Sequence, residues 1–166
     1  MHCDGEWCII ITSGEKWIKV GITKSVMFIG EYQHSIDGKG RMAVPAKFRQ
    51  VLKKGAIVTR GLDSCLFVYT ATEWQKLVDR LTDLPLSQSK SRAFSRFLLA
   101  GAIDVSVDAQ GRILIPEYLR KFAGLKKDTT IAGLYNRLEV WDTSVWEKYQ
   151  LATEKSSVKI AEDLGI

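Results

Sequence analysis

The sequence predicts an α+β protein built from two tandem copies of one small strand-and-helix module, related by a pseudo-two-fold axis within one chain. An internal repeat and the same order of strand, turn and helix signals in both copies support this prediction. The chain has 166 residues, of which 46% are hydrophobic and 26% charged. These values are typical of a soluble globular protein and exclude a mostly disordered chain.

The repeat is visible in two segments that lie 71 residues apart. Residues 37–49 read DGKGRMAVPAKFR, and residues 108–120 read DAQGRILIPEYLR. The identities are Asp37 with Asp108, Gly40 with Gly111, Arg41 with Arg112, Pro45 with Pro116, and Arg49 with Arg120. Each copy has only about 45 residues, too few for a sufficient core of its own. We therefore expect the copies to fold into one another, like a dimer joined in one chain.

Each copy begins with two strands joined by a tight turn. Glycine permits the positive φ that such turns need, and aspartate accepts hydrogen bonds from the backbone that follows it. A proline then ends the return strand and suits the first position of a short helix. The expected elements are strands at 32–36 and 102–107, return strands at 41–44 and 112–115, and helices after Pro45 and Pro116.

A second pair of strands and a closing helix complete each copy. The strands are expected at 56–59, 65–69, 130–132 and 138–141, and Cys65 is expected to be a small core residue. Capping-box patterns precede the closing helices at Thr70-x-x-Glu73 and Ser144-x-x-Glu147. The predicted organisation is an extension (1–26), module 1 (31–76), a linker helix (85–101), module 2 (105–148) and a tail (151–166). Within the tail, 153–163 is expected to be a short helix or loose chain.

Basic charge is concentrated on the turn and the helix that follows it. The formal net charge is +5, and no acidic residue interrupts the segment from Gly38 to Gly61, which has seven basic ones. The repeated Asp-x-x-x-Arg has two interpretations. It is either a hairpin salt bridge that fixes register, or part of a two-stranded ribbon that enters the DNA major groove, with Arg bonded to guanine edges and Lys to phosphates.

The sequence offers little to catalysis, and we expect no cofactor, metal or small-molecule substrate. There are two histidines and three cysteines, without Cys-x-x-Cys or a nucleotide-binding motif. An enzyme that uses Asp37 and Asp108 as a carboxylate pair is disfavoured, because the arginine at hairpin spacing would lower each pKa. No apolar run approaches the roughly 20 residues of a membrane-spanning helix, so the cytoplasm is the expected compartment.

Several segments resemble the MraZ family of bacterial transcriptional regulators. They are MFIGEYQHSIDGKGRMAVPAKFR from Met27, the second DAQGR motif, RGLDSCLFVYTATEW and NRLEVWDTSVWEKY. The resemblance implies an AbrB-like swapped-hairpin β-barrel, with both modules in one chain. It also implies a ring-shaped homo-oligomer associated with the nucleoid. Such a ring binds tandem double-stranded DNA repeats upstream of the division and cell-wall gene cluster, usually as a repressor.

The predicted site lies on the two turns and the first short helix. The residues expected to contact DNA are Lys39, Arg41, Arg112, Lys47 and Arg49. The residues expected to shape the hairpins are Asp37, Gly40, Asp108 and Gly111. The second turn has Gln110 where the first has Lys39, so the hairpins are not expected to contribute equally.

Two alternatives stay open. Residues 1–26 lie outside the repeat and the resemblance; they are either the product of a misassigned start codon, which we favour, or a regulatory arm that senses redox state through Cys3 and Cys8. The chain could also be a protein-binding module akin to an antitoxin of the same fold. Such proteins carry one barrel module and a disordered tail, where this chain has a second module.

Overall fold

The computed structural model describes residues 7–11, 17–21 and 27–165, and it has a mixed α+β fold. The larger sheet in this part of the chain is antiparallel, with six strands in the order β3-β9-β10-β6-β5-β7. Strands β4 and β8 form a separate antiparallel pair. Among the described helices, none is long and apolar enough to cross a bilayer.

Each strand and helix predicted for the two modules has a counterpart. The first repeat contains β3 (Phe28–Ser35), β4 (Arg41–Ala43), α1 (Ala46–Leu52), β5 (Ala56–Arg60), β6 (Leu66–Thr70) and α2 (Ala71–Thr82). The predicted linker helix is α3 (Ser89–Leu99). The second repeat contains β7 (Ile103–Val105), β8 (Arg112–Leu114), α4 (Glu117–Phe122), β9 (Asp128–Tyr135), β10 (Leu138–Asp142) and α5 (Thr143–Leu164). The boundaries of the predicted domains stay predictions.

The N-terminal extension is described only in part. Its strands β1 (Trp7–Ile11) and β2 (Trp17–Gly21) pair antiparallel with each other. Cys3 lies outside the described residues, and only the backbone of Cys8 is described. The redox hypothesis for this arm therefore stays untested.

The two repeats exchange strands. β3 of the first repeat pairs with β9 of the second, from Phe28 opposite Tyr135 to Ser35 opposite Asp128. In return, β7 of the second repeat pairs with β5 of the first. β4 likewise pairs with β8 of the second repeat. It contacts the end of β3 in its own repeat through the bridge between Ile36 and Met42 and the bond from the Asp37 N–H to the Arg41 carbonyl. No closed barrel is found among the described residues, so that part of the predicted fold stays a prediction.

The exchange has a physical reason in the core, which both repeats build together. Met42 and Ile113 lie opposite each other in the β4–β8 pair, and each is 1% exposed. Phe28 and Phe48 meet edge to face, with ring centroids 5.0 Å apart. Burying one such side chain contributes about 1.5–3 kcal/mol. Neither repeat has enough of these residues to exclude water alone, and the exchange unites them in one core.

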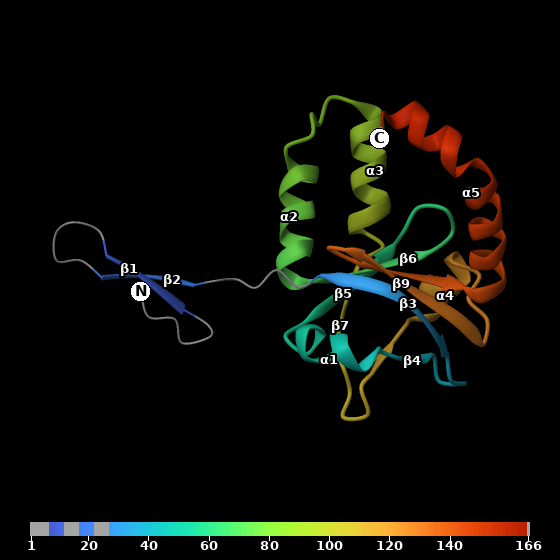
Figure 1. Cartoon of the computed structure of the whole chain (residues 1–166), viewed down its shortest axis with the longest axis horizontal. Helices are drawn as coiled ribbons and strands as arrows, with labels where there is room; N and C mark the ends of the chain where they lie inside the picture. Colours follow the sequence, from blue (N-terminus) through green and yellow to red (C-terminus); the bar gives the residue numbers. More distant parts are fainter. Residues whose placement is uncertain (1–6, 12–16, 22–26, 166) are drawn as a thin grey trace.

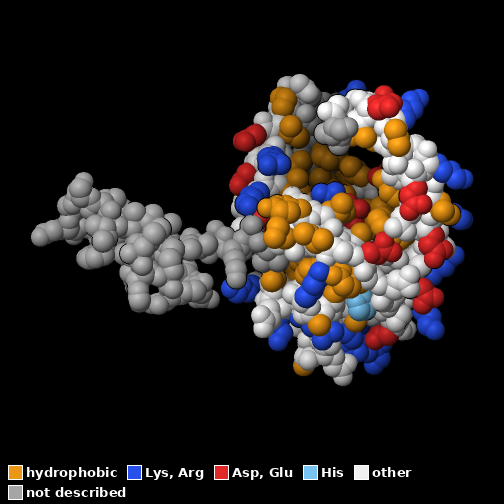
Figure 2. All heavy atoms as spheres, in the orientation of Figure 1, with side chains coloured by type: hydrophobic (Ala, Val, Ile, Leu, Met, Phe, Trp, Pro, Cys, Tyr) orange, Lys and Arg blue, Asp and Glu red, His pale blue; other side chains and the backbone are white. Residues whose placement is uncertain are grey.

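A second apolar cluster lies under the helices. It contains Cys65, Phe67, Tyr69 and Trp141, with Trp74, Leu77 and Trp146 packed against them. In Figure 1, α2, α3 and α5 all lie on the same side of the sheet. α2 and α3 are neighbours there, and α5 faces them from the other end of the sheet. Figure 2 shows a hollow between these helices with hydrophobic side chains on its walls. The prediction that Cys65 is a buried core residue is confirmed.

The closing helices begin at different caps. Thr70 caps α2 as predicted, since its Oγ1 accepts from the Glu73 N–H at 3.2 Å. The prediction that Ser144 caps the last helix is wrong: Asp142 is the cap, and its carboxylate accepts from Ser144. This helix continues to Leu164, so the tail segment 153–163 is helical rather than loose.

Candidate nucleic-acid interface

The first turn is organised around the carboxylate of Asp37. Its Oδ1 accepts from the backbone N–H groups of Lys39 and Arg41, both at 2.9 Å. Its Oδ2 accepts from Arg41 Nε at 2.7 Å. The backbone closes the turn through Gly40 N–H to the Asp37 carbonyl, at 2.9 Å. The carboxylate therefore fixes the loop and the arginine that follows it.

The second turn repeats this arrangement at Asp108. Its Oδ1 accepts from the N–H groups of Gln110 and Arg112, both at 2.9 Å. Arg112 makes two bonds to Oδ2, from Nε at 2.9 Å and from Nη2 at 2.7 Å. The hairpin-structuring roles predicted for Asp37 and Asp108 agree with these bonds.

These contacts keep both aspartates ionised. The pKa of Asp37 is lowered, chiefly by the hydrogen bond from the Arg41 backbone. The pKa of Asp108 is lowered, chiefly by the hydrogen bond from the Arg112 side chain. A carboxyl with a lowered pKa is a poor proton donor near neutral pH, so the pair suits a structural role better than acid–base catalysis.

The exchange of strands brings the two motifs together although they lie 71 residues apart in the sequence. Ala43 pairs with Arg112 in the β4–β8 ladder, and Arg41 pairs with Leu114. Arg112 Nη1 lies 3.8 Å from Asp37 Oδ2, which joins the two motifs in one charged cluster. The side chains of Arg41 and Arg112 are 34% and 23% exposed. The structure thus presents both arginines on one surface.

The other predicted contact residues have different surroundings. Lys39 is exposed in the first turn. Lys47 is exposed on α1, and its Nζ lies 2.5 Å from the Ile29 carbonyl oxygen and 4.9 Å from the centre of the Tyr32 ring. Arg49 is half-buried and donates from Nε to the Val44 carbonyl at 2.8 Å. Lys39 is therefore free to reach a ligand, whereas Lys47 and Arg49 each bond a backbone carbonyl.

Sequence reasoning did not select Arg120 for the site. Its Nε donates to the Ile115 carbonyl at 3.1 Å, which copies the bond of Arg49 in the other repeat. The signal was available, because Arg49 and Arg120 occupy equivalent places in the repeat. Further Lys and Arg side chains surround the turns, and Figure 2 shows several of them over the end of the molecule that carries α1 and β4.

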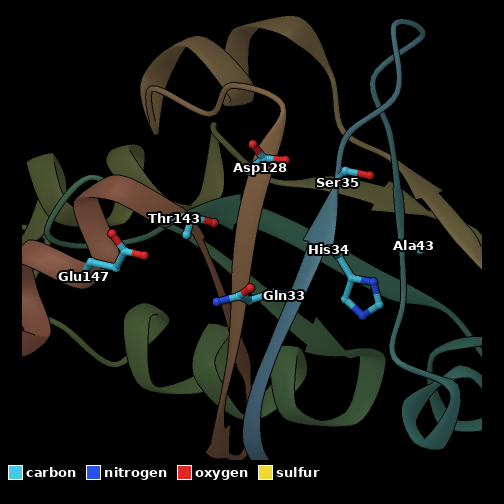
Figure 3. A pocket seen from close by; sticks show the side chains of 7 residues that line it. All are labelled: Gln33, His34, Ser35, Ala43, Asp128, Thr143 and Glu147. Atoms are coloured by element: carbon cyan, nitrogen blue, oxygen red, sulfur yellow. The ribbon is translucent and has the colours of Figure 1, made fainter.

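A surface pocket of about 570 Å³ lies beside this cluster. Figure 3 shows its lining residues, which come from β3, β4, β9 and α5: Gln33, His34, Ser35, Ala43, Asp128, Thr143 and Glu147. Partial burial and the nearby charge of Arg49 lower the pKa of His34, so the imidazole is mostly neutral at pH 7. Across the described residues, no three His, Cys, Asp or Glu side chains are grouped to hold a metal ion.

The chain matches the family model described as "MraZ protein, putative antitoxin-like" twice, over residues 27–97 and 98–164. It is similar to the transcriptional regulator MraZ of Acetivibrio thermocellus, with 51% identity over 140 residues, 84% of this chain and 98% of the relative. The proteins of the same name from Caldanaerobacter subterraneus and Natranaerobius thermophilus are each 49% identical over 138 residues, 83% of this chain and 96% of the relative. The two matches follow the two repeats and cover both turns of the charged cluster. The chain therefore belongs to the MraZ family.

Proposed function

We propose that this protein is a sequence-specific DNA-binding regulator of transcription and that the two turns of the β4–β8 pair form its contact surface. One observation carries the proposal: two Asp-x-x-x-Arg turns, each braced by its own aspartate, lie together in one partly exposed charged cluster. A two-stranded ribbon of this kind fits the major groove. The relatives that cover both turns are named transcriptional regulators.

The first turn is the better candidate for reading bases. Arg41 donates to Asp37 through Nε. The contacts of the described residues include no intramolecular hydrogen bond from the two Nη atoms of Arg41. Arg112 instead uses Nε and Nη2 on Asp108 and holds Nη1 near Asp37. The first turn also carries Lys39 where the second has Gln110. Arg41 can therefore bond a guanine edge, Lys39 can neutralise a phosphate, and Arg112 braces the pair. Lys47 can reach a phosphate only by releasing the Ile29 carbonyl.

We further propose that the protein acts as a homo-oligomer, in a ring on tandem repeats upstream of the division and cell-wall genes, and represses them at the nucleoid. These points follow from the family resemblance, as does the AbrB-like barrel. The exchanged strands support the barrel, and exposed apolar side chains support assembly. Phe94 is 41% exposed, Tyr149 45% and Val158 72%. Several copies would also supply contacts that two turns cannot.

The test is a gel shift with DNA from upstream of the protein's own gene, against a scrambled duplex of equal length, at two salt concentrations. The proposal predicts a preference for the upstream DNA and weaker binding at the higher salt, because phosphate contacts release counterions. An antitoxin-like protein-binding module predicts no preference between the duplexes. Equal binding to both would therefore reject sequence-specific regulation.

A further inference from the structure

The two turns are held by residues of the opposite repeat. Val44 directly follows β4, the return strand of the first repeat, and its N–H donates to the carbonyl of Gly111 in the second turn at 2.9 Å. The carbonyl of Val44 accepts from Arg49 Nε at 2.8 Å. The guanidinium of Arg49 then lies against Gly111, where a Cβ would stand 2.6 Å from Arg49 Cδ. Arg49, Val44 and Gly111 form a closed set of contacts.

The same set occurs a second time with the repeats reversed. The Ile115 N–H donates to the Gly40 carbonyl at 2.9 Å, and the Ile115 carbonyl accepts from Arg120 Nε at 3.1 Å. A Cβ on Gly40 would lie 3.1 Å from Nε, Cζ and Nη2 of Arg120, so the guanidinium covers that glycine. The two sets share no residue, and each observation therefore supports the other independently.

The covered glycines are the residues on which turn geometry depends. Gly40 has φ +80° and Gly111 has φ +78°, a left-handed conformation that other residues adopt at a cost. Each is buried and directly precedes the arginine of its motif. A planar guanidinium can lie flat over a peptide and donate in its own plane, whereas a lysine ammonium cannot. The contact thus limits how far Arg41 and Arg112 can move relative to the sheet.

We propose that Arg49 and Arg120 are positioning residues that act across the repeats. Arg120 of the second repeat holds the first turn, with Lys39 and Arg41, and Arg49 of the first repeat holds the second turn, with Arg112. Arg49 is thereby assigned a role different from the DNA contact predicted for it. The connection to DNA affinity rests on the proposed function, whereas the crossed support of the turns does not.

Hydrogen exchange of the full chain, read by mass spectrometry, tests the crossed arrangement. The reporters are the N–H groups of the two turns: Lys39, Gly40 and Arg41 in the first, and Gln110, Gly111 and Arg112 in the second. We expect Arg120→Lys to speed exchange in the first turn roughly two- to tenfold and to leave the second unchanged, because one hydrogen bond supports each contact. Arg49→Lys should do the reverse. Exposed Arg80 on α2 supplies the control, and Arg80→Lys should change neither turn.

The pattern of exchange decides the inference. Faster exchange only in the turn of the variant's own repeat, in both turns equally or in neither would overturn it. Arg49→Gln and Arg120→Gln repeat the test with a planar amide in place of the planar guanidinium. Poor folding of one variant therefore does not prevent a decision.

DNA binding provides a second readout. Arg120→Lys should lower the affinity for upstream DNA roughly two- to tenfold, with the slope of log K against log salt unchanged, because the charge is kept. If Arg120 were a phosphate contact, Arg120→Gln would make that slope shallower by about 0.9, which would overturn the positioning role. If the unaltered protein showed no preference for upstream DNA over a scrambled duplex, the proposed function would be rejected. The hydrogen-exchange result would still stand.

Discussion

Three glycines of the two turns give a matched test of how the turns are built. Gly40 and Gly111 have positive φ and lie under an arginine of the opposite repeat. Gly38 lies in the same turn as Gly40, is not among the positive-φ residues, and a Cβ added there would meet nothing within 4 Å. Replacing each with alanine adds the same atom in three different surroundings.

The structure sets the order of the effects on the free energy of unfolding. Gly40→Ala should cost about 1–2 kcal/mol, because an L-residue is strained in the left-handed region. Gly111→Ala should cost about 1.5–3.5 kcal/mol. Beyond the same backbone strain, Arg49 must also move and weaken its bond to Val44, which adds about 0.5–1.5 kcal/mol. Gly38→Ala should change stability by no more than about 1 kcal/mol, and in the stabilising direction, because it restricts only the unfolded chain.

Urea unfolding of the full chain, at one fixed protein concentration, measures these differences. The expected order of stability is Gly38→Ala, then Gly40→Ala, then Gly111→Ala. If Gly38→Ala destabilised the protein as much as Gly40→Ala, any side chain in the loop would be disruptive, whatever its backbone conformation. A neutral Gly111→Ala would show that neither the backbone conformation nor the cover by Arg49 matters, and the account of the turns would be refuted.

Three further predictions follow from the extension, the aspartates and the proposed assembly. A protein that begins at Met27 should fold, assemble and bind upstream DNA as the full chain does, because the family match begins there. Light scattering measures the assembly and a gel shift the binding. A large loss of either would show that the extension is functional. The destabilisation caused by Asp37→Asn should be constant above about pH 5 and shrink as the pH falls below the ordinary pKa of 3.8, because a lowered pKa stabilises the fold only while the carboxylate is ionised. Urea midpoints of the variant and the unaltered protein from pH 7 to pH 3 measure this difference. A difference that does not change with pH would contradict the prediction. Affinity should rise steeply from one to three tandem DNA repeats, by roughly 10²–10⁴ in total, as later contacts become intramolecular; fluorescence anisotropy with light scattering tests this, and a monomer indifferent to repeat number would reject the assembly model.

Much of the local structure could be predicted because each signal is local. Asp37 and Gly40 determine a turn wherever the chain then goes, and Thr70 caps the helix that directly follows it. The partner of a strand is a different kind of question. The alternation in β4 places Met42 inward, but it cannot show whether Met42 meets its own repeat or Ile113 of the other. A pseudo-symmetric repeat makes both pairings equally consistent with the pattern.

The candidate site shows the same division. The sequence pointed to Asp37, Arg41, Asp108 and Arg112, and the structure brings all four together. Charge alone could not separate Arg49 from the other basic residues, because its partners are a carbonyl and a glycine contributed by distant segments. The last cap was missed because Ser144-x-x-Glu147 fits the pattern, although Asp142 precedes it and its carboxylate accepts from Ser144.

Arg41→Ala shows whether the first turn reads DNA. The side chain is 34% exposed and absent from the core, so the variant should fold and assemble normally. Loss of one bidentate base contact should reduce specific affinity roughly 5- to 150-fold in each subunit that uses it. Fluorescence anisotropy should compare upstream DNA with a scrambled duplex, and Arg80→Ala on α2 controls for the loss of one positive charge. We expect Arg41→Ala to abolish the preference for upstream DNA and Arg80→Ala to keep it. A folded Arg41→Ala protein with normal affinity and preference would show that the first turn does not read DNA.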